Sequence, residues 1–221
     1  MIHSENRIIA FIDILGFKEF IKCAEKANDY TKLSNLIEES IELFNSFNPT
    51  NDFQFTQFSD SFVLSCRSFN LNDSMVFMIH LQDLIHLFLS ENILLRSGIT
   101  IGKVVHTENV LMGTGMNRAY ELESQLAKYP RIIIDNDLIN YWNDSFYSEG
   151  LNFENVLEVS KDSDDFYFMD YINKSNLPPM INILLNKSYE LLNSNIPSLV
   201  DKGVWLMKKL ENHLKYIIQS K

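Results

Sequence analysis

The chain has 221 residues, of which 46% are hydrophobic and 22% are charged, a composition that supports a sizeable core and excludes global disorder. Its 19 Lys and Arg against 29 Asp and Glu give a formal net charge of −10, which disfavours binding to nucleic acid or anionic lipid. No apolar run approaches the roughly 20 residues of a membrane span, and the start lacks the pattern of a signal peptide. We therefore expect a cytoplasmic protein that binds neither nucleic acid nor membrane, with Cys23 and Cys66 as reduced core residues.

The first half of the chain predicts one buried strand, two helices, a hairpin and a long helix. A β-rich run ends before Gly16, and Ser59-Asp60-Ser61 is short enough to be the tight turn of the hairpin. The expected elements are a strand over 7–13, helices over 17–27 and 31–47, hairpin strands over 53–58 and 62–66, and a helix from 72–74 to about 90.

The second half continues with a long strand that contains Gly98 and Gly102. Glycines inside a strand are typical of bulges, or of the close approach of another backbone or a ligand. The elements expected after this strand, which covers 93–105, are a helix over 116–128, a strand over 131–134, a hairpin over 156–160 and 166–172, and helices over 180–192 and 197–218.

This order of elements indicates an α+β fold with an antiparallel hairpin at the centre of the sheet. Helices are expected on one face, as in ferredoxin-like or polymerase-palm domains. We expect residues 1–176 to form the main domain and residues 177–221 to form a C-terminal helical extension packed on it, because that segment is too short for a second domain.

Two carboxylates stand out by their positions. Asp13 ends the first strand and Asp60 lies at the tip of the hairpin, and strand pairing would bring both to one edge of the sheet. Two adjacent carboxylates favour a cation between them, and Mg²⁺ prefers such oxygen ligands. Gly16 leads into a helix N-terminus whose N–H groups could hold phosphates. The alternative is that each Asp is only a turn residue or a helix cap.

Four segments resemble one enzyme family in order and spacing. These segments are FIDILGF at 11–17, FSDSFVL at 58–64, RSGITIG at 96–102 and GTGMNRAYELE at 113–123. They are similar to class III nucleotidyl cyclases over about residues 7–172, and in particular to the bacterial pyrimidine cyclases of the anti-phage signalling systems called Pycsar.

The resemblance implies a metal-dependent reaction at a shared site. Asp13 and Asp60, with the carbonyl of Ile14, would hold two Mg²⁺ or Mn²⁺ ions, and Gly16 and Phe17 would contact the nucleoside triphosphate. The ribose 3′-hydroxyl would attack the α-phosphate and release pyrophosphate. The family also implies a head-to-tail homodimer with sites at the interface, and a separate effector that senses the cyclic nucleotide during anti-phage defence.

The choice of base departs from the purine cyclases of this family. Thr56 stands where adenylate cyclases carry Lys, and Val110 stands where they carry Asp or Thr, while Asn117 matches the catalytic Asn. A short hydroxyl at position 56 suits a smaller ring, which predicts UTP or CTP as substrate and cUMP or cCMP as product, with UTP slightly preferred. Thr56 could instead serve strand propensity alone.

The family's transition-state arginine is replaced by Glu121 in this chain. Arg118, as a catalytic residue, and Arg96, as a substrate-binding residue, are the candidate replacements, followed by Lys103 and Arg131. Each of these cations could equally form a structural salt bridge. Two other functions therefore stay open: a purine cyclase, and a degenerate cyclase fold that acts as a non-catalytic nucleotide-binding dimerisation module.

The remaining features predict ordinary structure. Tyr120, Leu122 and Leu126 are expected in a helix core. The acidic run at 162–165 is expected to be a solvated turn, and the lysines at 208–209 are expected on an exposed helix face.

Overall fold

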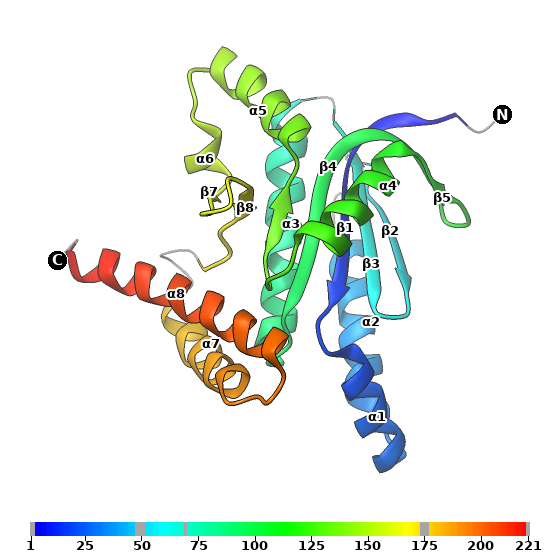
Figure 1. Cartoon of the computed structure of the whole chain (residues 1–221). Helices are drawn as coiled ribbons and strands as arrows, with labels where there is room; N and C mark the ends of the chain where they lie inside the picture. The colour runs from blue at the N-terminus through cyan, green and yellow to red at the C-terminus, as the bar shows by residue number, and fades with distance from the viewer. Residues whose placement is uncertain (1–2, 47–51, 69, 173–176, 220–221) are drawn as a thin grey trace.

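An eight-stranded mixed sheet organises the computed structural model, which describes residues 3–46, 52–68, 70–172 and 177–219 (Figure 1). Along the sheet the strand order is β2-β3-β1-β4-β6-β8-β7, and β5 pairs with the end of β4. The strands are β1 (Glu5–Ile14), β2 (Gln54–Phe58), β3 (Ser61–Arg67), β4 (Leu95–His106), β5 (Leu111–Met112), β6 (Ile132–Ile134), β7 (Val159–Lys161) and β8 (Tyr167–Met169).

The helices begin and end where local signals place them. Gly16, with φ of 83°, precedes α1, and Asn28 in the left-handed region ends it. Asn70 and Asp73 form a reciprocal capping box at the start of α3. The helices are α1 (Phe17–Ala27), α2 (Thr31–Asn45), α3 (Leu71–Ser90), α4 (Thr114–Glu121), π-helix η2 (Leu122–Leu126), α5 (Asn136–Ser148), α6 (Phe153–Val156), α7 (Leu177–Leu192) and α8 (Pro197–Gln219). None of the helices in the described ranges is long and apolar enough to cross a membrane.

Strand β1 is buried on both faces, and its alternate residues belong to two different layers. Ile8 and Ile12 point into the main core, which also contains the buried side of α3. Ile9 and Phe11 point to the opposite side, where they contact Val63 of β3 and residues of α4. We call this second side of β1–β4 the open face, because α4 crosses it above β4 while large side chains elsewhere on it stay exposed.

Two glycines let α4 lie directly on β4. A Cβ at Gly98 would lie 2.4 Å from the Cβ of Leu122 and 2.5 Å from the carbonyl oxygen of Ala119. A Cβ at Gly102 would lie 2.9 Å from the Cα of Gly115. The close approach of another backbone that these strand glycines predicted is therefore confirmed.

The α+β architecture is confirmed, but the β2–β3 hairpin lies at one edge of the sheet and not at its centre, where β4 lies instead. Strand β1 pairs with β3 of the hairpin, as expected, and with β4 on its other side. Helices α5 and α6 and the short strand β5 were not predicted, and the helix expected over 116–128 is α4 followed by a π-helix that ends at Leu126. Residue 47, at the expected end of the second helix, lies outside the described residues.

Two side chains expected in a core are exposed. Cys23 lies on the solvent side of α1, while Cys66 is buried as expected. Tyr120 is 53% exposed because α4 packs on β4 through its smallest residues, which leaves the ring at the rim of the contact with Phe11.

The C-terminal helices pack into the main core and are tied to the turn between β7 and β8. Leu206 and Leu210 of α8 are fully buried. The Asp162 carboxylate in that turn accepts a hydrogen bond from the indole N–H of Trp205 at 2.9 Å and pairs with Lys209 at 3.1 Å. Asp162 is therefore not solvated and Lys209 is not exposed, contrary to both expectations. The domain boundary expected at residue 176 lies outside the described residues, so the division into two units stays a prediction.

Candidate active site

Asp13 and Asp60 meet at the edge of the sheet where β1 ends and the β2–β3 turn begins. The Ile14 N–H donates to the Asp60 carbonyl at 2.9 Å, and Asp13 lies opposite Ser61 in the β1–β3 ladder. The Asp13 side chain is 17% exposed, so one side of it reaches solvent. Burial, and to a smaller extent the Asp60 charge, raise the pKa of Asp13, while Arg96 opposes both effects. Two carboxylates therefore share one corner of the open face.

Arg96 joins this corner to a third carboxylate. Its Nε lies 2.9 Å from Oδ2 of Asp13 and 2.6 Å from Oε1 of Glu123, which comes from the π-helix η2. Glu123 is nearly fully buried, and burial raises its pKa to about 7, with Asp13 and Asp60 adding to the rise and Arg96 opposing it. The corner thus holds two carboxyl groups, of Asp13 and Glu123, on one guanidinium, with the Asp60 charge close by.

This arrangement fits a divalent cation. The Ile14 N–H is bonded to the Asp60 carbonyl, but among the described residues Asp60 does not return an N–H bond to the Ile14 carbonyl. The carboxylates of Asp13 and Asp60 and the backbone carbonyl of Ile14 consequently offer oxygen ligands to a cation at this corner. The described side chains contain no cage of three or more His, Cys, Asp or Glu, so this is a shallow site of the kind that Mg²⁺ completes with substrate phosphates and water.

A cavity adjoins the chain segment that follows the carboxylates. Its volume is about 490 Å³, and it is lined by Leu15 and Gly16 on one side and by Lys187 and Lys202 of the C-terminal helices on the other. Burial, followed by the positive charge of Arg96, lowers the pKa of Lys202, while Asp13 raises it. Gly16 thus borders a space in which Lys187 is paired with Glu190, while Lys202 lies near Asp13 and Arg96.

Thr56 lies on the open face, on the same side of β2 as Phe58, which contacts Phe11. It lies opposite Val63 in the β2–β3 ladder, and Val63 belongs to the open-face layer together with Phe11. The Thr56 hydroxyl is 2.9 Å from Nε2 of His106, at the end of β4. Val110 lies between β4 and β5, where its N–H and carbonyl both bond to Thr107.

The cations predicted on α4 and β4 have different environments. Arg118 binds Asp135 with two hydrogen bonds, Nε to Oδ2 at 2.9 Å and Nη2 to Oδ1 at 2.8 Å, and also pairs with Glu121 at 3.1 Å. Asn117 is exposed on α4. Lys103 is exposed, and because it lies seven residues after Arg96 along β4, it belongs to the opposite face. Within one chain, only Arg96 of these residues lies in the Asp13 corner.

Arg131 has the structural role that was left open for it. Its guanidinium is 1% exposed and pairs with Asp162 at 2.9 Å and with Asp164. It therefore fixes the turn between β7 and β8 and is not available to a substrate.

Three residues at the site were not predicted from the sequence. Glu123 belongs to a motif of the sequence analysis but received no role there. Its spacing of two residues from Glu121 was the available signal, because it places Glu123 on another side of the helix. His106 and Lys202 carry no local signal, because they reach the site through the course of β4 and the packing of α8.

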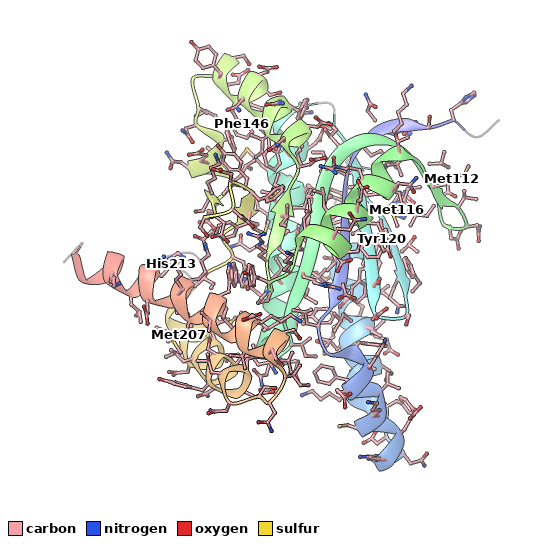
Figure 2. All side chains as sticks on the ribbon, viewed as in Figure 1. Met112, Met116, Tyr120, Phe146, Met207 and His213 are labelled. Atoms are coloured by element: carbon pink, nitrogen blue, oxygen red, sulfur yellow. The ribbon has the colours of Figure 1, made fainter. Side chains whose placement is uncertain are left out.

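Exposed apolar side chains surround α4 on the open face. Phe58 is 43% exposed, Met112 is 55% exposed and Tyr120 is 53% exposed. Figure 2 shows Met112, Met116 and Tyr120 following one another along β5 and α4. Large rings and thioethers left in water in this way are typical of a surface that contacts another protein chain.

Solved structures similar to this fold include nucleotide cyclase domains. The chain is similar to a monomeric guanylyl cyclase domain of the RhoGC fusion protein from the aquatic fungus Blastocladiella emersonii, with a TM-score of 0.53 and 16% identity over 76% of this chain and 98% of that chain. It is also similar to a bacterial light-regulated adenylyl cyclase, with a TM-score of 0.50 and 14% identity over 81% of this chain and 97% of that chain. No model of a protein family and no curated protein matches the sequence. The fold is therefore that of class III cyclase domains.

Proposed function

We propose that this protein is a metal-dependent nucleotidyl cyclase that converts a pyrimidine nucleoside triphosphate, UTP or CTP, to its 3′,5′-cyclic monophosphate. The observation that carries the proposal is the pairing of Asp13 and Asp60 beside the Ile14 carbonyl, on a fold whose solved relatives are cyclase domains. In the reaction a bond forms between the ribose O3′ and the α-phosphorus, and the bond from that phosphorus to the pyrophosphate oxygen breaks. The hydroxyl proton leaves to solvent or to a nearby base.

The residues of the corner have complementary parts in this chemistry. Asp13, Asp60 and the Ile14 carbonyl would hold two Mg²⁺ or Mn²⁺ ions, which supply the lowered hydroxyl pKa and offset the phosphate charge when bound. Arg96 is already oriented by Asp13 and Glu123, so it can bind a phosphate oxygen without losing much side-chain freedom. Lys202, which is close enough to Asp13 and Arg96 for their charges to shift its pKa, could contact the β- and γ-phosphates together with Gly16.

A pyrimidine is proposed because position 56 offers a short hydroxyl where purine enzymes of the resembled family have a long cation. Thr56 keeps this hydroxyl on the same face as Asp13, since both residues pair in register with residues of β3 that share that face. A catalytic part for Arg118 and Asn117 requires a second chain, because neither lies in the Asp13 corner of its own chain, and Arg118 would have to give up part of its pairing with Asp135 to bind substrate.

A homodimer with sites at the interface is part of this proposal. The exposed Phe58, Met112 and Tyr120 on the open face support it, because an isolated chain would leave these side chains in water next to the site. The anti-phage role and a separate effector that reads the cyclic nucleotide rest on the sequence resemblance. They can be tested by phage infection of cells that carry the gene, with cyclic nucleotides measured by mass spectrometry.

The proposal is tested by incubating the purified protein with each of the four triphosphates and Mn²⁺ and identifying the products by mass spectrometry. A cyclic pyrimidine nucleotide supports the proposal. A cyclic purine nucleotide would show that the substrate is ATP or GTP, and the absence of any cyclic product would favour a non-catalytic nucleotide-binding module. Asp13→Asn and Asp60→Asn keep the side-chain shape and should each abolish turnover, whereas Asp144→Asn on exposed α5 should not. Full activity of either site variant would refute the metal assignment.

A further inference from the structure

A chain of four hydrogen-bonding residues ends at Thr56, and each of the four comes from a different strand. Arg7 Nε donates to the Ser65 hydroxyl at 2.9 Å, the Ser65 hydroxyl is 2.8 Å from Nδ1 of His106, and Nε2 of His106 is 2.9 Å from the Thr56 hydroxyl. Arg7, Ser65 and His106 are 3%, 0% and 6% exposed, while Thr56 is half-buried on the open face. The three buried residues can therefore determine whether the Thr56 hydroxyl, which reaches the surface, donates or accepts a hydrogen bond.

The direction of these hydrogen bonds is fixed at Arg7. A guanidinium can only donate, so the Ser65 oxygen accepts from Arg7 and has one hydrogen left to give. In the part of the chain that the structure describes, Nδ1 of His106 is the only acceptor within reach of that hydrogen. If Nδ1 carried a proton instead, the Ser65 hydrogen would be buried without an acceptor, which disfavours that arrangement by about 5- to 150-fold.

The imidazole therefore carries its proton on Nε2 and donates to Thr56. Burial, followed by the charge of Arg7, lowers the pKa of His106 to about 4, while Asp52 opposes them, so the ring is neutral and has a single N–H at neutral pH. The Thr56 oxygen accepts that hydrogen. Its own hydrogen then remains for a group outside the chain, because the described residues offer it no second partner.

We infer that the relay from Arg7 through Ser65 and His106 presents Thr56 as a hydrogen-bond donor, and that the pocket thereby selects uracil, which has an oxygen at position 4, over cytosine, which has an amino group there. This inference rests on the proposed cyclase function and names its base. At position 4 uracil offers an oxygen that accepts the Thr56 hydrogen, whereas cytosine offers an amino donor and leaves that hydrogen without an acceptor. His106 acts through Thr56 and is a positioning residue.

The kinetic test compares the specificity constants for UTP and CTP in wild-type protein and in His106→Phe. The wild type should prefer UTP by about 5- to 150-fold, which is the effect of one unpaired buried polar group. Phenylalanine keeps the planar ring but removes the N–H of His106, so the Thr56 hydrogen can turn inward and leave only acceptor lone pairs toward the base; turnover of CTP should then rise and the ratio should fall to within about 3-fold. A loss of structure alone would lower both rates and leave the ratio unchanged.

His80→Phe is the matched control. His80 also has a pKa lowered to about 4 by burial, but it lies on α3, on the far side of the sheet from Thr56. Its variant should keep the UTP preference of the wild type. An equal loss of preference in both variants would overturn the inference.

A second measurement tests the relay without turnover. In ¹⁵N-labelled protein the two imidazole nitrogens of His106, assigned by their absence in His106→Phe, should show the hydrogen on Nε2, and a hydrogen on Nδ1 overturns the relay. Wild-type protein that cyclises CTP as well as UTP overturns the base assignment and leaves the cyclase function intact. Wild-type protein that cyclises no triphosphate overturns the proposed function, and the base assignment with it.

Discussion

A methyl group added at Gly98 should disturb the fold and the candidate site together. The Cβ of Gly98→Ala would lie 2.4 Å from the Cβ of Leu122, 2.5 Å from the carbonyl oxygen of Ala119 and 2.8 Å from the backbone nitrogen of Glu123. Backbone atoms cannot rotate away, so the junction of α4 and η2 must lift from β4. Overpacking of this kind costs about 1–3 kcal/mol and sometimes more. We expect about 3 kcal/mol, because the three approaches occur together.

The assay is thermal unfolding of Gly98→Ala beside Gly150→Ala. For a chain of this size each kcal/mol lowers Tm by about 2–4 °C, so the expected fall at Gly98 is about 6–12 °C. Gly150 has φ of 70° and no atom within 4 Å of an added Cβ, so its variant should lose only about 1–2 kcal/mol from backbone strain. A Tm shift at Gly98 no larger than the shift at Gly150 would show that α4 does not rest on β4 in this way.

Three further predictions concern charge and assembly. Burial raises the pKa of Glu123 to about 7 from 4.5, so the folded state binds its proton more tightly than the unfolded state. Up to about 3 kcal/mol of stability that is present below pH 4.5 is therefore lost as pH rises through 7. The free energy of unfolding in urea should show this fall with pH in the wild type but not in Glu123→Gln. Lys202→Met should raise KM for the triphosphate about tenfold, with little change in Tm, if α8 contacts the phosphates; an unchanged KM would remove Lys202 from the site. Equal mixtures of Asp60→Ala and Asn117→Ala chains should recover about a quarter of wild-type activity, because half of the dimers then have one intact site; no recovery would argue against shared sites.

Much of the sheet could be predicted because its strands carry their own signals. The apolar run of β1 and the turn at Asp60 predict that β1 pairs with the hairpin, and this pairing brings Asp13 beside Asp60. The bounds of α1 were predicted to the residue, since Gly16 and Asn28 mark both ends. Helix α5 was missed because Asn, Asp and Tyr separate its four buried residues and hide their helical spacing.

The parts of the site that could not be predicted depend on contacts between distant segments. Glu123 reaches Arg96 only because Gly98 lets η2 lie on β4, and no sequence pattern near residue 123 predicts that contact. Tyr120 follows a helical apolar pattern, yet it is exposed because α4 covers just one strip of the open face. The pairing of Arg118 with Asp135 joins two elements whose relation no local pattern determines.

The exposed apolar side chains on the open face have a consequence for how the rate of product formation depends on the concentration of the protein. If two chains must meet there to complete a site, then below the dissociation constant of the pair the amount of working enzyme grows with the square of chain concentration. A twofold rise in expression would then raise the rate of product formation fourfold, and dilution would silence the protein without any inhibitor. Specific activity measured across a dilution series would show this threshold directly. Replacing Tyr120 and Met112 with polar residues should abolish specific activity in the same concentration range.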